Sequence, residues 1–231
     1  MSDASAPQPA PWVAIFDWDG IIVDSASQHE ASWDRLAAEE RRVLPAGHFK
    51  RGFGMKNALI IPELLGWTRD PQEIRRLSQR KEALYREIVA ETGITALPGV
   101  ERLLASLQAA GIPCAVGSST PRENIAFALD RLGLRHAFAH IVAAEDVTRG
   151  KPDPQIFLLA AQALRMPPTR CVVFEDTPVG IQAAKAAKMR VVAVATSHPV
   201  ASLVEADRIV ARLNELSIRE LESLALERRG S

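Results

Sequence analysis

The chain has 231 residues, enough for one large domain or for a core with a smaller attachment. Its 28 Lys and Arg residues balance 28 Asp and Glu residues, and this zero net charge disfavours nucleic acid or an anionic membrane as the main partner. A chain of this size buries about 70–75% of the surface of its unfolded form, so its core requires neither a disulfide nor a structural metal.

The N-terminus and the cysteines narrow the class of protein. Residues 1–10 have neither the basic nor the apolar segment of a signal peptide, and we expect a flexible tail there. No apolar run approaches the roughly 18 residues that a membrane span needs. Cys114 and Cys171 lack the spacing of a metal site, so we expect buried thiols. These features together predict a cytoplasmic protein.

After the tail, short apolar runs alternate with helical patterns. Continuous apolar runs of four to six residues, each followed by a helix, are typical of a parallel sheet covered on both faces. We therefore predict an α/β fold with an open, doubly wound (Rossmann-like) parallel sheet. The predicted strands are residues 12–16, 112–117, 140–144, 171–174, 191–195 and, more weakly, 208–210.

Residues 26–93 interrupt this alternation. They contain no convincing strand, and apolar residues recur at helical spacing between positions 70 and 90. We predict that this segment is a helical cap inserted into an α/β core made of residues 11–25 and 94–231. Within that core, the sequence TPRE (120–123) predicts a capping box at the start of a helix.

Polar side chains follow the predicted strands. Ligands of open α/β sheets bind outside the carboxyl ends of the strands, and neighbouring strands lie only about 4.8 Å apart. We therefore expect the side chains at these ends to converge on one edge of the sheet. They are Asp17 and Asp19, then Ser118, Ser119 and Thr120, then Lys151, and finally Glu175 and Asp176.

This mixture of side chains has a chemical logic. Clustered carboxylates repel one another unless a cation neutralises them, and hard oxygen ligands suit Mg²⁺. A neighbouring lysine and hydroxyls suit a phosphoryl group, whose transfer depends on positioning and on neutralising charge. An aspartate can attack phosphorus directly, and a second acid two residues later can reach the leaving-group oxygen.

Four stretches resemble the motifs of the haloacid dehalogenase-like (HAD) superfamily, in the order found in that family. They are DWDG (17–20), Ser118, KPDP (151–154) and EDTPVG (175–180). The helical insert is similar to the C1 cap of the family, and the resemblance covers residues 12–212. The branch that the sequence resembles is the β-phosphoglucomutase-like and sugar-phosphate phosphatase group.

The resemblance implies roles for the core residues. Asp17 would be the nucleophile and a Mg²⁺ ligand, while Asp19 would be the general acid and base and would bind Mg²⁺ through its backbone carbonyl. Asp176 would be the other metal ligand. Phosphate would be held by Ser118, with Ser119 nearby, and by Lys151.

Other residues keep two interpretations. Glu175 would be a metal ligand or a partner of the ligands, and it can equally cap the helix predicted over residues 177–187. Asp24 would lie at the hinge between core and cap or cap the helix that follows it. In the cap, His29 and Lys81 resemble residues that face the substrate in relatives, although a packed histidine and a solvated lysine explain them as well.

Three functions follow. The favoured one is a Mg²⁺-dependent phosphatase that hydrolyses a small phosphomonoester, with a sugar phosphate as the preferred class, through an aspartyl-phosphate. The alternative is a β-phosphoglucomutase-type mutase, which needs a cation in the cap for a second phosphate. Mutases resemble one another in an arginine about three residues after the cap-loop glycine, here Gly52, and this chain offers only Lys56 nearby. The third is a non-catalytic binding module.

The partner expected for all of the enzymatic functions is a small phosphorylated metabolite. Substrate specificity would come from the cap loop, residues 51–57, and from the predicted helix over residues 70–90. Dehalogenase and phosphonate-hydrolase chemistry are disfavoured because Asp19 is present. The sequence does not indicate an oligomeric state, and a monomer is compatible with it.

Overall fold

The computed structural model describes residues 10–52 and 55–227. The predicted tail therefore lies outside the described residues except for Ala10, and so do residues 53 and 54 of the cap loop. In the described part of the chain, no helix is long and apolar enough to cross a membrane.

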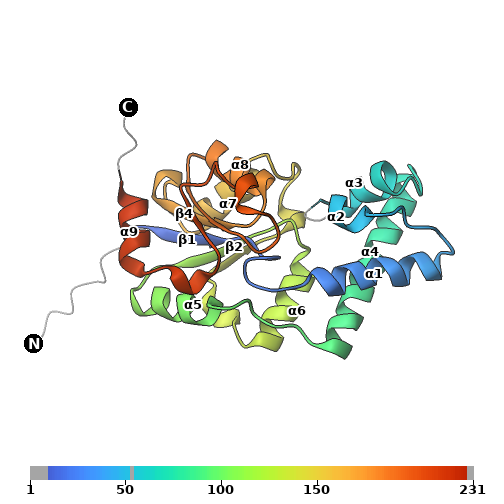
Figure 1. Cartoon of the computed structure of the whole chain (residues 1–231), viewed down its shortest axis with the longest axis horizontal. Helices are drawn as coiled ribbons and strands as arrows, with labels where there is room; N and C mark the ends of the chain where they lie inside the picture. The colour runs from blue at the N-terminus through green and yellow to red at the C-terminus, as the bar shows by residue number, and fades with distance from the viewer. Residues whose placement is uncertain (1–9, 53–54, 228–231) are drawn as a thin grey trace, which may run out of the picture.

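One parallel sheet forms the centre of the molecule (Figure 1). Within the described residues it has six strands, in the order β3-β2-β1-β4-β5-β6. The direction of the strand order reverses beside β1, and ligands of doubly wound sheets bind at such a reversal. The strands are β1 (Val13–Phe16), β2 (Cys114–Gly117), β3 (His140–Val142), β4 (Cys171–Glu175), β5 (Arg190–Val194) and β6 (Arg208–Val210).

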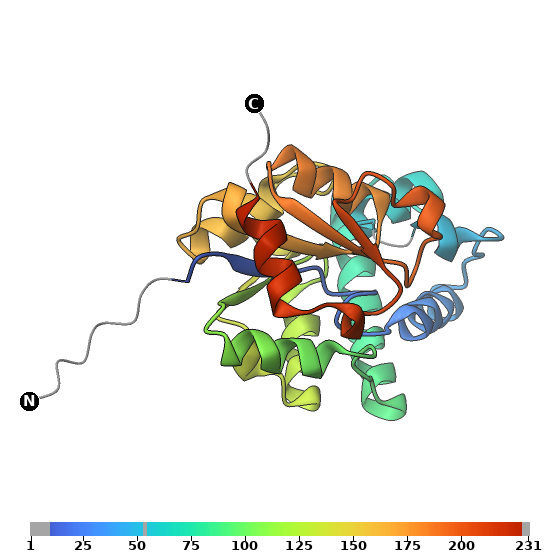
Figure 2. The same cartoon turned by 60° about the vertical axis from the view of Figure 1, so that its left-hand side comes forward.

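Helices cover both faces of the sheet, as Figure 2 shows. Alternate residues of β1 point to opposite faces: Ala14 and Phe16 pack with α5, α6 and α9, while Val13 and Ile15 pack with α7 and α8. The sheet is thus buried on both sides, which explains its continuous apolar strands. These helices are α5 (Val100–Ala109), α6 (Arg122–Leu132), α7 (Gln155–Ala163), α8 (Pro178–Ala186) and α9 (Ile218–Leu226).

The cap is a separate helical unit at the end of the molecule opposite α9 (Figure 1). Its own apolar cluster includes Trp33, Leu36 and Leu77, and none of these belongs to the two clusters of the core. Its elements are α1 (Ala26–Glu39), α2 (His48–Gly52), α3 (Asn57–Leu59), the π-helical segment η1 (Ile60–Leu64) and α4 (Pro71–Thr92).

Short 3₁₀ segments complete the described secondary structure. They lie in the connections of the core, and several directly precede or follow a strand. These segments are η2 (Arg135–Ala137), η3 (Ala144–Asp146), η4 (Pro168–Arg170), η5 (Val200–Ser202) and η6 (Leu213–Glu215).

The predicted α/β class is confirmed, and each predicted strand is present within about two residues of its expected bounds. Cys114 and Cys171 are buried free thiols, as expected. The predicted capping box at 120–123 is wrong. Helix α6 begins at Arg122 with Pro121 at the N-cap position, so Thr120 lies one residue before the cap, and its hydroxyl donates to the Asp19 carboxylate.

Two predicted helix caps also fall on other residues. The N-cap position of α1 is Ser25 rather than Asp24, and Ser25 makes no capping hydrogen bond. Thr177, not Glu175, caps α8 by accepting a hydrogen bond from the Gly180 amide. Asp24 lies next to the bridge between Val23 and Ala96, where the chain passes between core and cap.

Candidate active site

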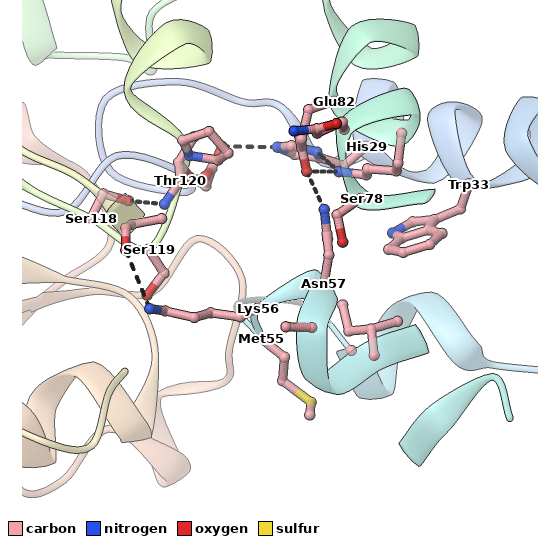
Figure 3. Close-up of a pocket in the computed structure, with 18 of the residues that line it drawn as sticks. His29, Trp33, Met55, Lys56, Asn57, Ser78, Glu82, Ser118, Ser119 and Thr120 are labelled. Atoms are coloured by element: carbon pink, nitrogen blue, oxygen red, sulfur yellow. Dashed lines mark hydrogen bonds and ion pairs between the residues drawn. The ribbon is translucent and has the colours of Figure 1, made fainter. Parts of the chain in front are cut away.

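The polar residues that follow the strands converge below the cap. Asp17 follows β1, Ser118 follows β2, and Glu175 ends β4, so the parallel pairing of these strands brings the three side chains to one edge. A cavity of about 910 Å³ opens there, lined by residues of both core and cap. Figure 3 shows Ser118, Ser119 and Thr120 on its core side and Trp33 and Ser78 on its cap side.

Lys151 joins two carboxylates at the base of this cavity. Its Nζ atom lies 2.8 Å from Asp17 Oδ1 and 2.5 Å from Glu175 Oε1, and all three side chains are buried. Burial raises the pKa of Asp17 to about 6, although the positive charge of Lys151 opposes this rise. Burial alone would lower the pKa of Lys151, but the charges of Asp17 and Glu175 raise it above its usual value.

Carboxylate oxygens of Asp17, Glu175 and Asp176 lie within 4.8 Å of one another. Asp176 is fully buried, its Oδ1 atom has no hydrogen-bond partner within the described residues, and its pKa is well above the usual value because of burial and the charges of Glu175 and Asp17. Three acids beside one lysine leave a negative excess among buried side chains. These residues therefore fit a hard divalent cation such as Mg²⁺.

The oxygens of Glu175 already have protein partners. Oε1 receives Lys151, while Oε2 accepts hydrogen bonds from the Asp176 and Thr177 amides at 2.8 Å and from the Thr177 hydroxyl at 2.9 Å. A cation bound here would therefore be held chiefly by Asp17 and Asp176, while Glu175 contacts Lys151.

A glycine allows this close packing. Gly20 has a φ angle of +77°, and a Cβ atom there would lie 2.0 Å from Asp176 Oδ2. A side chain at this position would therefore both strain the backbone and displace the Asp176 carboxylate.

Two residues after β5, which the sequence analysis missed, support the same acids. The Ser197 hydroxyl donates to Asp176 Oδ2, and the Thr196 hydroxyl donates to the Gly20 carbonyl at 2.5 Å. With Oδ2 held by Ser197, the unpaired Oδ1 is the oxygen left for a ligand. The rule that functional groups follow parallel strands applies to β5 as well, and it was the signal available for these residues.

Asp19 is held by three partners. Its carboxylate accepts hydrogen bonds from the Ser25 and Thr120 hydroxyls, and His29 Nε2 lies 3.5 Å from Oδ1. Burial would raise the pKa of Asp19, but hydrogen bonds from His29 and from the Ser25 and Thr120 hydroxyls lower it to about 2. Asp19 is therefore ionised in this arrangement. Ser25 was not singled out from the sequence, and Thr120 was assigned to a helix cap.

His29 and Lys81 extend this network into the cap. Lys81 Nζ lies 2.7 Å from His29 Nδ1. Because a lysine ammonium only donates, Nδ1 must accept, so the ring proton is on Nε2, facing Asp19. The His29 ring also stacks on Tyr85 at 4.0 Å, and Lys81 contacts Glu82 Oε1 at 3.1 Å. Both residues line the cavity, but their polar atoms bind protein groups.

A family model described as haloacid dehalogenase-like hydrolase matches residues 13–188. The chain belongs to the haloacid dehalogenase-like hydrolases. This confirms the resemblance of the motifs and the prediction of an enzyme.

Two curated members of the family illustrate how similar this chain is to characterised enzymes. It is 42% identical over 215 residues to the chloroplastic 5-amino-6-(5-phospho-D-ribitylamino)uracil phosphatase of Arabidopsis thaliana, a match that covers 92% of this chain. The chain spans only 57% of the length of that relative. It is also 34% identical to hexitol phosphatase A of Escherichia coli (strain K12), covering 88% of this chain and 92% of that one.

Among solved haloacid dehalogenase-like structures, β-phosphoglucomutase from Clostridium difficile matches with a TM-score of 0.82 at 27% identity. The match covers 94% of this chain and 97% of that chain. This chain therefore shares the fold of its core and cap with a mutase. Its sequence is also similar to sequences of phosphatases.

The remaining predicted site residues lie around the cavity of this hydrolase. Ser118 is buried and its hydroxyl accepts from the Thr120 amide at 3.3 Å, while Ser119 lines the cavity. Lys56 extends from the cap toward the core, where its Nζ atom lies 3.3 Å from the Ala144 carbonyl oxygen and 3.4 Å from that of Val147 (Figure 3). The cap lysine is thus already engaged by core carbonyl groups.

Proposed function

We propose that the chain is a Mg²⁺-dependent phosphatase that hydrolyses a small phosphomonoester through an aspartyl-phosphate on Asp17. The observation that carries this proposal is the buried pair between Asp17 and Lys151, 2.8 Å apart at the base of the cavity, with Asp19 two residues farther along the chain. A nucleophile, a cation that binds the phosphoryl oxygens and an acid on the leaving-group side are then in one place.

In this proposal, Asp17, Asp176 and the backbone carbonyl of Asp19 hold Mg²⁺, which would supply positive charge against the phosphoryl oxygens. Lys151 and Ser118 hold the phosphate, with Ser119 beside them. Glu175 keeps Lys151 in place through the contact at 2.5 Å. The domain division follows the same logic: the core of residues 11–25 and 94–231 carries the chemistry, and the cap of residues 26–93 covers it.

Hydrolysis then proceeds in two steps, phosphoryl transfer to Asp17 and hydrolysis of the aspartyl-phosphate. A carboxylate oxygen of Asp17 bonds to phosphorus, the ester P–O bond breaks, and the leaving oxygen takes a proton from Asp19. Water next attacks the phosphorus of the aspartyl-phosphate while Asp19 accepts a proton from it, the bond between the Asp17 oxygen and phosphorus breaks, and inorganic phosphate leaves. Because its partners hold Asp19 ionised here, we expect substrate binding to displace one of these hydrogen bonds and raise its pKa before the first step.

The relatives suggest where to look for the substrate. Both curated relatives described above are named as phosphatases of phosphorylated polyols or of a ribityl compound. A phosphorylated sugar or polyol is therefore the proposed class, and 5-amino-6-(5-phospho-D-ribitylamino)uracil is the first candidate, since the match to its phosphatase is 42% identical over 92% of this chain.

A β-phosphoglucomutase-type activity is the second candidate, favoured by the structural match at a TM-score of 0.82. A mutase must bind a bisphosphate, whose far phosphate requires a cation from the cap. Lys56 lies in the cap loop expected to supply this cation, and it already contacts two backbone carbonyl groups. The phosphatase is therefore the better-supported function.

The test measures phosphate release from a panel of sugar and polyol phosphates, with Mg²⁺ or with EDTA. Asp17→Asn serves as the control for contaminating phosphatases. We expect release that requires both Mg²⁺ and Asp17. Conversion of β-glucose 1-phosphate to glucose 6-phosphate, with a trace of bisphosphate and little free phosphate, would establish the mutase instead. Silence in both assays would favour a binding role.

A further inference from the structure

The cap side of the cavity carries side chains that phosphate chemistry does not use. What we infer about the ligand of these side chains rests on the proposed function. The cavity volume of about 910 Å³ is near the upper end of the roughly 300–1,000 Å³ typical of pockets for drug-sized ligands. The phosphate-binding groups lie at its core end. A substrate that fills the rest must extend well beyond the phosphate.

One wall of this cap-side compartment is apolar and partly aromatic. Trp33 is 3% exposed and packs edge-on against Trp67, with ring centroids 6.1 Å apart, so its position is fixed before any ligand enters. Phe49, Ile60 and Ile74 also line the cavity, and they belong with Trp33 to the apolar cluster of the cap. An apolar wall favours contact with a flat ring. The hydroxyl groups of a simple sugar would not cover the wall, which would then stay in contact with water.

Helix α4 supplies polar groups to the same compartment. Arg75, Ser78 and Gln79 are spaced three and four residues apart, so they share one face of the helix, and all three line the cavity. None of their side chains makes a hydrogen bond or ion pair with the described part of the chain.

The other arginines of α4 have side-chain partners, in contrast to Arg75. Arg76 pairs with Glu40 at 2.7 Å, Arg80 pairs with Glu39 at 2.6 Å, and Arg86 donates to Asn124 at 2.8 Å. These pairs hold α4 against α1 and the core. Arg75 is the arginine of α4 that remains available to a ligand, among the residues that the structure describes.

We propose that this compartment binds a planar heterocycle with carbonyl and N–H groups, carried by the substrate at the end of its polyol chain away from the phosphate. The guanidinium of Arg75 would donate to ring carbonyl groups, and the amide of Gln79 can both donate and accept. The flat ring would lie along the wall formed by Trp33 and its neighbours. A second phosphate fits less well, since the other cap lysines and arginine that line the cavity already contact protein groups; they are Lys56, Lys81 and Arg86.

The test compares two substrates that share phosphate and polyol. One is 5-amino-6-(5-phospho-D-ribitylamino)uracil, and the other is D-ribitol 5-phosphate, which lacks the heterocycle. We expect the wild-type kcat/KM to favour the first by at least about 100-fold, because a site built to bind polar groups rejects an analogue without them. Arg75→Ala and Gln79→Ala should each reduce this ratio about tenfold, mainly through KM.

Arg76→Ala is the matched control, because Arg76 is the next residue on α4 but pairs with Glu40 on the surface. A ratio near one in the wild type would overturn the compartment while leaving the phosphatase intact, and so would an equal loss of the ratio in the Arg76 variant. A stronger preference for D-ribulose 1,5-bisphosphate that depends on Arg75 would assign the compartment to a second anion and overturn the heterocycle.

If no phosphomonoester is hydrolysed, the proposed function fails, but the compartment is still tested by calorimetry. The probe is the dephosphorylated 5-amino-6-(D-ribitylamino)uracil. Binding to the wild-type chain that weakens about tenfold in Arg75→Ala, but not in Arg76→Ala, supports the inference. Absence of binding to the wild type overturns it.

Discussion

The two ends of the cavity differ in how their polar groups are held. At the core end, Lys151 is bound between two acids and Asp19 between two hydroxyls and a histidine, so these groups have fixed positions before substrate arrives. At the cap end, Arg75 and Gln79 have no side-chain partner within the described residues. The comparison suggests that the sheet provides preorganised chemistry, while the cap presents free groups that select the substrate.

Several side-chain contacts join the two regions, among them those of His29 with Asp19 and of Arg86 with Asn124. The carboxylate of Glu82 in α4 accepts from Asn124 of α6 at 2.5 Å, and Lys56 reaches the core carbonyl groups of Ala144 and Val147. The cap has its own apolar cluster. Substitutions in the core or in the cap can therefore test whether catalysis depends on the core and substrate selection on the cap.

The largest effect is expected from Asp17→Asn, which changes the core end alone. An amide cannot serve as the nucleophile, so kcat should fall by at least about 10⁴-fold. The variant keeps the shape of the side chain, removes one of three clustered negative charges and leaves Lys151 paired with Glu175, so the thermal unfolding midpoint should not decrease. Phosphate release and circular dichroism measure the two quantities. Activity within tenfold of the wild type would remove Asp17 from the nucleophile role.

Lys151→Met should cost the core end much of its stability as well as its activity. The Lys151 side chain is 6% exposed, and its loss leaves Asp17 and Glu175 buried beside each other without their cation. The free energy of unfolding in urea with EDTA should fall by about 3–5 kcal/mol.

The matched control for this variant is Lys185→Met. Lys185 pairs with Asp207 at 2.9 Å, but its side chain is 32% exposed, so the pair is screened by water. We expect a change of at most about 1 kcal/mol there. Equal losses in the two variants would contradict the view that the Lys151 site is a special, dry electrostatic cluster.

Asn124→Ala tests the boundary between the halves. Asn124 is fully buried and binds both Glu82 and Arg86 of the cap helix. Removing it leaves buried charged groups with fewer partners, so the free energy of unfolding should fall by about 1–3 kcal/mol. An unchanged urea midpoint would show that cap and core are held together by other contacts.

Ser197→Ala should produce the smallest effect and sharpen the description of the core end. Without the hydroxyl on Asp176 Oδ2, the carboxylate loses its orientation, and Mg²⁺ affinity measured by calorimetry should fall about tenfold. Saturating Mg²⁺ should restore most of kcat. Ser202→Ala is the control, because the Ser202 hydroxyl binds the Pro199 carbonyl, away from the acids. Equal Mg²⁺ affinity in both variants would exclude a positioning role for Ser197.

Much of the core end could be predicted because local patterns determine it. Each strand is a short apolar run, and Asp17 and Glu175 lie at the ends of neighbouring parallel strands, so their convergence follows from the fold class. The helical insert could likewise be predicted from the helical spacing of its apolar residues. By contrast, the partners of Asp19 were only partly foreseen, because Thr120 is 101 residues away and suits a helix cap equally well.

The sequence by itself determined the alternation of strands and helices, the place of the cap and the identity of the acids and lysine at the strand ends. The tertiary structure alone decided which hydroxyl supports which acid, as with Ser197 and Asp176, and which arginine of α4 is left free. The physical reason is the distance along the sequence over which each feature is encoded. Hydrophobic periodicity and strand ends are encoded within a few residues, whereas a side-chain partner depends on how distant elements pack.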